Sequence, residues 1–238
     1  MMRRLISLFY VAVWVLPIFG AQVANFENDE NVKSNQVLSR YKNNSVVFLK
    51  NDSFFIAELD SRGKIVNAAY TTDFDRIQPE GQFAYSEKSG ELYYVNGGKL
   101  FKAKQRKSGK WVNSAYIEVK GSEVKRDKYP GSVLAYANWR YLPKDSIVIV
   151  NPTINSQGDV LYFSSNMNNV KSRDIWEMSK DQNGEWGNPV RLDASVNTVD
   201  ADEDFPFVND EGMLVFASNR GNASQSDSTY SLFSKSEP

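Results

Sequence analysis

Two segments of the chain concentrate charge of opposite sign. Residues 193–204 contain five acidic side chains and no basic one, whereas residues 120–128 contain four basic side chains against two acidic ones. Separated patches of this kind can orient a charged protein partner. A dense run of carboxylates also suits Ca²⁺, although this run lacks the glycine and the distal glutamate of an EF-hand loop. These segments therefore favour binding of a charged partner or ion over catalysis. The alternative is that they are ordinary solvated loops.

The composition excludes several classes of catalytic site. The chain has 238 residues with no His and no Cys, so it can have no Ser-His-Asp triad, no cysteine nucleophile and no thiolate zinc site. Its 28 basic and 29 acidic residues nearly balance, which argues against a nucleic-acid-binding protein. Gly97, Gly98 and Gly109 fall in hairpin-like turns and not at a strand-to-helix junction, so no phosphate loop is predicted. We expect a protein that is not an enzyme and has no cofactor and no metal.

The N-terminus has the pattern of an export signal. Two arginines, Arg3 and Arg4, precede an apolar stretch from Leu5 to Phe19 that is too short for a comfortable membrane span, and Gly20 and Ala21 are small. Residues 1–21 are predicted to be a cleaved signal peptide, with an uncleaved anchor as the alternative. Residues 22–36 are polar and show neither the hydrophobic periodicity of a helix nor that of a strand, which predicts a flexible leader. Residues 37–238 would then form the folded domain, with no transmembrane span after cleavage.

Short strands recur along this domain without a convincing amphipathic helix. Stretches rich in β-branched and aromatic residues are bounded by Asn, Asp and Gly, which favour tight turns. This pattern predicts an all-β fold. The strands are expected at residues 45–49, 54–59, 91–95, 146–150, 160–164 and 213–217.

Internal repetition favours a propeller over a sandwich. Pro152 and Gly158 recur 54 positions later as Pro206 and Gly212, and Phe163 recurs 53 positions later as Phe216. A further copy lies upstream around residues 92–111, and residues 45–64 form a weaker first copy. A repeat of about 45–55 residues with four short strands is typical of a propeller blade. The large aromatic residues Phe163, Trp176, Trp186 and Phe216 are expected to pack one blade against the next.

The repeat resembles a known family. Residues 151–166, 174–176 and 186–198 are similar to the TolB-type WD-like β-propeller repeat of bacterial envelope proteins, and residues 203–206 and 214–220 continue the pattern. The match is strong over residues 150–221, fair over 80–121 and weak before that. The family often carries an OmpA-like domain, which is absent from this sequence. The resemblance implies a role in the Gram-negative cell envelope.

About four four-stranded blades fit into the chain, which leaves ring closure open. The strand at residues 45–49 could complete the last blade, the propeller could be partial, or the chain could close by assembling with a partner. Alternating connections place the loops of residues 96–98, 120–130, 166–173, 193–204 and 219–227 on one face. The partner-binding residues predicted on this face are Lys125, Arg126, Lys128, Asn166, Arg173, Asp200, Asp202, Glu203, Asp204, Asn219 and Arg220.

These observations predict an exported, non-catalytic propeller that acts as a protein-protein interaction scaffold. Its expected location is the periplasm or the outer membrane, and its expected partner is an envelope protein. One alternative is a propeller that binds or cleaves glycans, with peptidoglycan as a partner. Cleavage would need two acids at a defined separation, and no sialidase-type box is present. Another alternative is that the chain is a fragment of a longer propeller.

Overall fold

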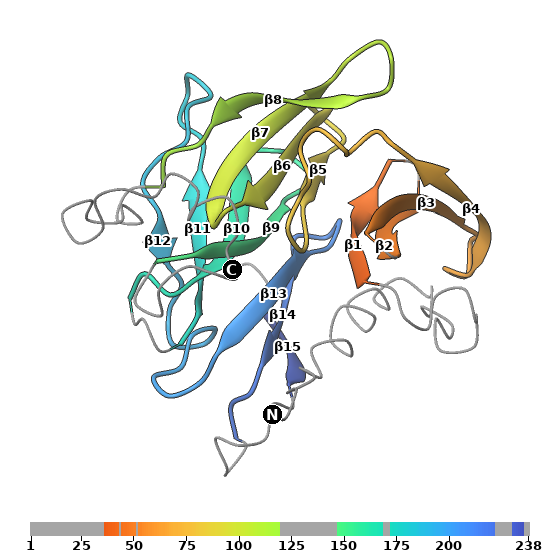
Figure 1. Cartoon of the computed structure of the whole chain (residues 1–238). Coiled ribbons are helices and arrows are strands. Elements are labelled where there is room, and N and C mark those ends of the chain that lie inside the picture. Colours follow the sequence, from red (N-terminus) through yellow and green to blue (C-terminus); the bar gives the residue numbers. More distant parts are fainter. Residues whose placement is uncertain are drawn as a thin grey trace, which may run out of the picture.

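The computed structural model describes residues 36–42, 44–50, 52–119, 147–168, 172–221 and 230–235. All regular elements in these residues are β-strands, and they form four antiparallel sheets (Figure 1). The expectation of an all-β fold is confirmed for this part of the chain.

The first two sheets, called blade 1 and blade 2, each have four strands in chain order. Blade 1 consists of β1 (Gln36–Tyr41), β2 (Ser45–Lys50), β3 (Ser53–Leu59) and β4 (Ile65–Thr71). Blade 2 consists of β5 (Ala84–Ser86), β6 (Glu91–Asn96), β7 (Lys99–Gln105) and β8 (Trp111–Tyr116).

Blades 3 and 4 follow the same up-and-down order. Blade 3 consists of β9 (Ile149–Ile154), β10 (Val160–Ser165), β11 (Asp174–Ser179) and β12 (Val190–Arg191). Within the described residues, blade 4 has three strands: β13 (Glu203–Val208), β14 (Leu214–Ser218) and β15 (Ser231–Lys235).

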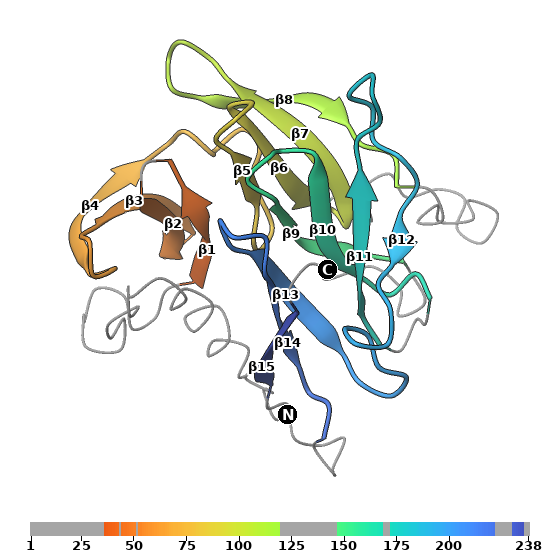
Figure 2. The ribbon, with the colours of Figure 1, turned by 180° about the vertical axis from the view of Figure 1, so that it is seen from behind.

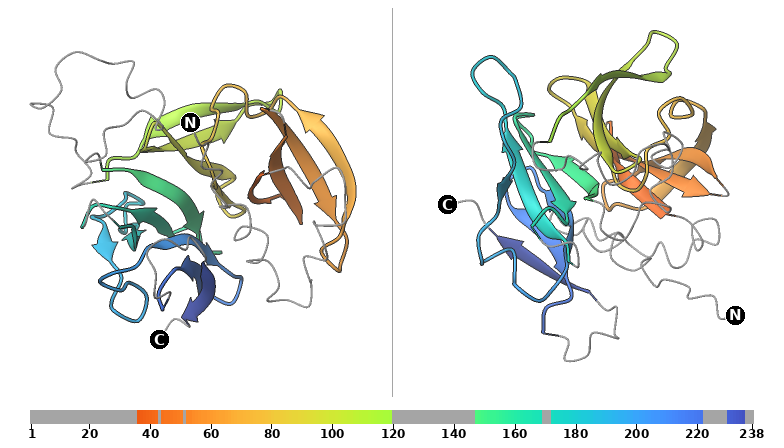
Figure 3. Two further views of the ribbon diagram at one scale, coloured as in Figure 1. Left: turned by 60° about the horizontal axis from the view of Figure 1, so that its bottom comes forward. Right: turned by 60° about the vertical axis from the view of Figure 1, so that its left-hand side comes forward.

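The four sheets are arranged as the blades of a β-propeller. The first strands of consecutive blades lie next to one another, β1 beside β5, β5 beside β9 and β9 beside β13. Seen from both sides, the sheets radiate from these strands (Figures 1 and 2). The tilted views in Figure 3 show blades 1 and 4 at the two ends of the series. The predicted architecture of four blades is therefore confirmed.

Three apolar clusters between successive blades form the core. Tyr41 and Phe54 of blade 1 pack with Tyr94 and Trp111 of blade 2. The next cluster joins blades 2 and 3 and includes Phe163, with Trp176 and Trp186 packed against it. Phe216 belongs to the cluster between blades 3 and 4. The aromatic residues predicted to pack blade against blade do so, because neither face of a single sheet can be buried without a neighbour.

Turn chemistry explains why the strands end where they do. Gly158 and Gly212, the repeated turn glycines, have φ of 73° and 83°, a conformation that L-residues rarely adopt. Three residues before each glycine lies an asparagine, Asn155 or Asn209. Its side-chain Oδ1 accepts backbone N–H groups of the same turn at 2.8–3.1 Å. These local bonds close the first hairpin of blades 3 and 4.

One predicted strand is misplaced and one closure option is not adopted. The strand expected at residues 146–150 is β9, which starts at Ile149 and continues through Pro152 to Ile154. Asn151, with φ of 52°, lies where the pairing register shifts, and a proline is tolerated at such a bulge because no ladder donor is required.

The strand at residues 45–49 is β2, which pairs with β1 and β3 inside blade 1 and does not complete blade 4.

Candidate partner-binding face

The described loops that were predicted to share a face lie at one end of the propeller. Asn166 Oδ1 accepts the N–H of Val148 at 2.8 Å, and Asn219 Oδ1 accepts the N–H of Asp202 at 2.8 Å. The same bond therefore occurs in blades 3 and 4. In each, an Asn just after the second strand accepts the N–H of the residue just before the first strand. The N–H of Ile149 donates to the Gly98 carbonyl at 3.3 Å, which adds the blade 2 loop to this end. The prediction of a common face is confirmed for these loops.

Asp204, the second residue of β13, is fully enclosed. Its Oδ2 is 2.8 Å from Nη2 of Arg173, and its side chain is 2 % exposed. Its Oδ1 accepts the amide of Asn151 and the N–H of Phe205, both at 2.8 Å. The carboxylate of Asp204 raises the pKa of Arg173 further above its ordinary value, so the guanidinium stays charged. Asp204 therefore ties the loop before β11 and the inner strand of blade 3 to blade 4.

Glu203 is the adjacent residue, and its side chain is 0 % exposed. Its carboxylate accepts Ser218 Oγ at 2.8 Å, Thr198 Oγ1 at 2.9 Å and the N–H of Thr198 at 3.1 Å. Arg220 Nη2 lies 3.2 Å from Oε1. Burial raises the pKa of Glu203 above its ordinary value, and these hydrogen bonds and Arg220 oppose that rise. Glu203 thus fastens the loop before β13 to the end of β14.

Arg220 is held inside blade 4 by more than this ion pair. Its guanidinium carbon lies 4.5 Å from the ring centroid of Phe233 and 5.2 Å from that of Phe216, distances that favour a cation-π contact. Nη2 also donates to the carbonyl of Val196. Arg220 therefore covers the outer end of the core between blades 3 and 4.

Asp202 and Tyr230 form the partly open edge of this network. Oδ1 of Asp202 accepts the N–H of Arg173 at 2.7 Å, and Oδ2 accepts the hydroxyl of Tyr230 at 3.2 Å. Burial raises the pKa of Tyr230, so the phenol stays protonated and continues to donate. Asp202 is intermediate in exposure and joins blade 3 to the strand that follows the last loop.

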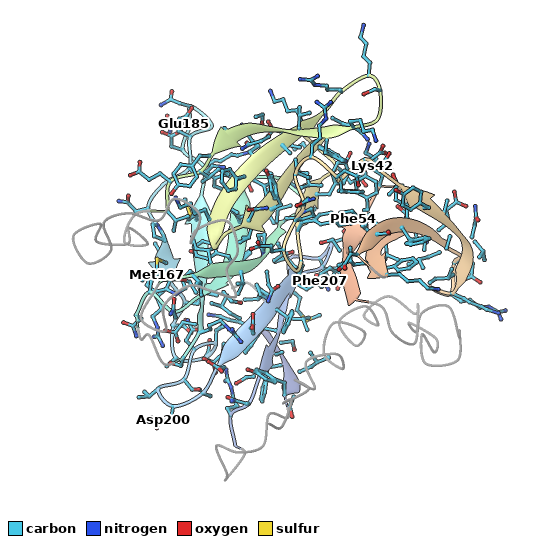
Figure 4. The ribbon with its side chains drawn as sticks, in the orientation of Figure 1. Lys42, Phe54, Met167, Glu185, Asp200 and Phe207 are labelled. Carbon is cyan, nitrogen blue, oxygen red and sulfur yellow. The ribbon has the colours of Figure 1, made fainter. Side chains whose placement is uncertain are left out.

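Val199 and Asp200 form the tip of the loop between blades 3 and 4. Val199 is 84 % exposed, and Asp200 is exposed as well. Figure 4 shows Asp200 at the outer end of the loop, directed away from the sheets. Behind the tip, Asn197 is buried and bonds to both the N–H and the carbonyl of Ile175 at 2.7 and 2.9 Å. The tip is thus presented to solvent on a loop that the buried network holds in place.

The structure separates the predicted residues into two groups. Asn166, Glu203 and Asp204 are buried and bonded within the protein, and Arg173, Asp202, Asn219 and Arg220 extend the same network. Asp200 is the one that projects from the face. Lys125, Arg126 and Lys128 lie outside the described residues, so the positive patch is not placed.

The sequence analysis did not identify the partners of the acidic run. Asn151, Ser218 and Tyr230 bind its carboxylates from other strands and loops, and Thr198 binds Glu203 from within the same loop. The repeat could have predicted one of these features. Asn166 and Asn219 occupy matching positions in successive copies and make matching hydrogen bonds. The carboxylates of residues 202–204 bind different partners. They therefore do not converge on one position where they could bind Ca²⁺ together. In the described part of the chain no group of three or more metal-binding side chains occurs.

Comparison with known proteins gives solved structures of low sequence identity and no family. No family model and no curated protein matches the chain. Similar solved structures include a protein from Lactobacillus plantarum, with 10 % identity and a TM-score of 0.41, covering 84 % of this chain and 54 % of that one. TolB from Acinetobacter baumannii has 13 % identity and a TM-score of 0.36, covering 84 % and 38 %. A streptogramin B lyase has 13 % identity and a TM-score of 0.37, covering 86 % and 55 %.

The chain therefore spans from two fifths to little more than half of each of these structures. One further similar structure is the Dos1 propeller. The similar structures include TolB and also enzymes, so they do not decide between binding and catalysis. Among the described residues, no helix is long and apolar enough to cross a membrane.

Proposed function

We propose that this chain is an exported, non-catalytic β-propeller that acts as a protein-protein interaction scaffold in a Gram-negative cell envelope. The observation that carries the proposal is the exposed tip formed by Val199 and Asp200, which stands on a loop fastened by buried Asn197 and Glu203. An apolar side chain beside a carboxylate on a pre-ordered loop binds with little loss of conformational entropy. Binding residues often lie on loops that a rigid scaffold positions.

Export is supported by the first 21 residues. They combine two arginines, an apolar stretch and a small-residue site at Gly20 and Ala21, which is the pattern of a cleaved signal peptide. Expression of the whole chain in a Gram-negative host tests this directly. We expect a periplasmic product whose mass corresponds to a new N-terminus at Gln22. A full-length product in the membrane fraction would favour the uncleaved anchor.

A binding experiment tests the scaffold role. The exported protein is immobilised and exposed to solubilised envelope, and the retained proteins are identified by mass spectrometry. The double variant Val199→Ser/Asp200→Lys changes the tip. Val190→Ser is the matched control, because Val190 is also strongly exposed but lies on β12. We expect one envelope protein to be retained by the wild type and the control and lost by the double variant.

The same experiment distinguishes the glycan alternative. Retention of peptidoglycan or polysaccharide without a protein would contradict the scaffold proposal. Equal retention of a protein partner by the wild type and the double variant would show that the tip is not part of the binding surface.

A further inference from the structure

Three aromatic rings at the junction of blades 1 and 2 form the walls of a cage. They belong to Tyr41 at the end of β1, Tyr85 of β5 and Trp111 at the start of β8. The rings are steeply inclined to one another, Tyr41 at 58° to Tyr85 and 69° to Trp111, and Tyr85 at 76° to Trp111. The corresponding centroids are 5.2, 6.3 and 6.1 Å apart. The three rings therefore form separate walls and do not stack on one another.

The ammonium group of Lys42 lies inside this cage. Its Nζ is 5.2 Å from the ring centroid of Tyr41, 5.5 Å from that of Trp111 and 5.7 Å from that of Tyr85. Lys42 directly follows β1 in the turn to β2, and Figure 4 shows it where blade 1 meets blade 2. The face of an aromatic ring attracts cations, so three faces around one point make a site for a cation.

The cage suits a cation without N–H groups better than it suits Lys42. A lysine ammonium has three donors. Among the described residues, Nζ of Lys42 donates one hydrogen bond, to Oε1 of Gln105, and forms no ion pair. Burial lowers the pKa of Lys42, although Asp73 and Glu87 oppose this shift. A quaternary ammonium group has no donors to satisfy and no proton to lose, and it keeps the attraction to all three rings.

The walls of the cage are held by bonds that do not involve Lys42. Nε1 of Trp111 donates to the hydroxyl of Tyr41 at 3.1 Å, and the N–H of Trp111 donates to the carbonyl of Asp73 at 2.8 Å. The backbone of Lys42 is fixed separately, because the N–H and the hydroxyl of Ser45 donate to its carbonyl at 3.1 and 2.6 Å. The side chain of Lys42 can therefore rotate away while the walls and the turn stay in place.

The cage lies close to solvent. Lys42 and Tyr85 are partly exposed, whereas Tyr41 and Trp111 are buried with Lys42 lying against both rings. Rotation of the lysine side chain into solvent therefore uncovers the ring faces that it occupies now. Connections alternate between the two ends of an antiparallel blade, so the turn that carries Lys42 lies at the end opposite the candidate partner-binding face.

We propose that the cage of Tyr41, Tyr85 and Trp111 binds quaternary ammonium groups, and that Lys42 occupies it as a built-in competitor. A trimethylammonium ligand enters when the side chain of Lys42 rotates out. The present occupant shows which chemistry the cage accepts, because it is itself an alkylammonium ion held by three rings. This site goes beyond the proposed scaffold role and does not depend on it.

Titration of the exported protein with choline tests this site. Isothermal titration calorimetry measures the affinity, and NMR of the indole N–H groups shows whether Trp111 responds. We expect Lys42→Ala to bind choline about tenfold more tightly than the wild type, because the competing ammonium is gone. Lys64→Ala is the matched control, because Lys64 is an exposed lysine in another turn of blade 1. It should bind choline as the wild type does.

A neutral analogue of choline separates the attraction to a cation from simple apolar burial. In this analogue a tert-butyl group replaces the trimethylammonium group, so shape is kept and charge is lost. Lys42→Ala should bind it about tenfold more weakly than choline. Replacement of the partly exposed wall by Tyr85→Leu, in the Lys42→Ala background, should also weaken choline binding. Equal affinities for choline and its analogue would overturn the assignment of a cation site.

A second substitution guards against an effect of Lys42→Ala on folding. Lys42→Met keeps an unbranched side chain in the turn and removes the charge, and its choline affinity should lie between those of the wild type and Lys42→Ala. Circular dichroism establishes that each variant is folded. Absence of saturable choline binding by both folded variants would overturn the proposal. Equal choline affinity of the wild type and both variants would show that Lys42 does not compete for the site, and this would overturn it as well.

Discussion

At the scale of single residues, the acidic run shows how neighbouring carboxylates acquire different surroundings. Glu203 and Asp204 are consecutive in β13, so their side chains point to opposite sides of the strand. Asp204 meets Arg173 and Asn151 of blade 3, whereas Glu203 meets the end of β14. Each carboxylate is matched by cations or donors, as burial requires.

Removal of the Glu203 carboxylate should be strongly destabilising. Glu203→Ala leaves Arg220 and two hydroxyl groups without their acceptor, and breaking a buried pair in this way costs about 3–5 kcal/mol of unfolding free energy. Urea unfolding followed by circular dichroism measures the loss. Asp200→Ala is the control at an exposed position and should change stability by less than about 0.5 kcal/mol. Equal effects of the two substitutions would contradict the role assigned to Glu203.

The same residue should produce a pH dependence of stability. Burial raises the pKa of Glu203 above its ordinary value, so the folded state holds the proton more tightly than the unfolded state. Its contribution to stability is therefore complete below the unfolded pKa and falls as the pH rises from about 4.3 through the folded pKa. Glu203→Gln cannot titrate. We expect the stability of the wild type relative to this variant to decrease over that window in urea unfolding at a series of pH values. An increase would reverse the predicted sign.

At the scale of elements, the hairpin turns also join one blade to the next. Gly158, in the turn between β9 and β10, has φ of 73°, and a Cβ built there would lie 2.7 Å from Ser86 Oγ of blade 2. Gly184 has φ of 82° with open space around it. The two glycines therefore share a backbone requirement and differ in their surroundings.

Alanine substitutions at these two positions should separate strain from packing. Gly184→Ala should cost about 1–2 kcal/mol, from the left-handed conformation alone. Gly158→Ala should cost about 1–3 kcal/mol more, because Ser86 is buried and cannot move away freely. Thermal denaturation measures both variants. Adding Ser86→Gly to Gly158→Ala should recover the extra loss, and additive effects in this double-mutant cycle would show that the turn does not touch blade 2.

At the scale of the whole molecule, stability is distributed over interfaces between repeats. Each of the three apolar clusters joins two successive blades, so blades 2 and 3 are each shared by two clusters. Loss of one interface therefore removes support from both of its blades, as expected for repeat proteins.

We expect the chain to unfold in one cooperative transition. Circular dichroism and tryptophan fluorescence should give the same midpoint. Leu161→Ala removes a fully buried side chain between blades 2 and 3 and should cost about 2–5 kcal/mol with both signals moving together. A broad, non-cooperative melt of the wild type would instead favour the alternative that the chain is a fragment of a longer propeller.

Local patterns in the sequence were sufficient for most strands and for the repeat. The strands predicted at residues 45–49, 54–59 and 160–164 agree with β2, β3 and β10 to within a residue or so at each end. The predicted leader ended at residue 36, however, and no strand was predicted at β1, which begins at Gln36. The sequence QVLSRY of β1 mixes apolar and polar residues, and its pairing with β2 determines its conformation.

The sequence alone therefore determined the all-β class, the blade repeat and the acidic loop, because each depends on residues that are close along the chain. The tertiary structure decided which carboxylates project and which are enclosed. Asp204 is buried by Asn151, 53 positions away, and Glu203 by Ser218, 15 positions away. Such contacts join residues that only folding brings together, and no short stretch of sequence contains both members of a pair.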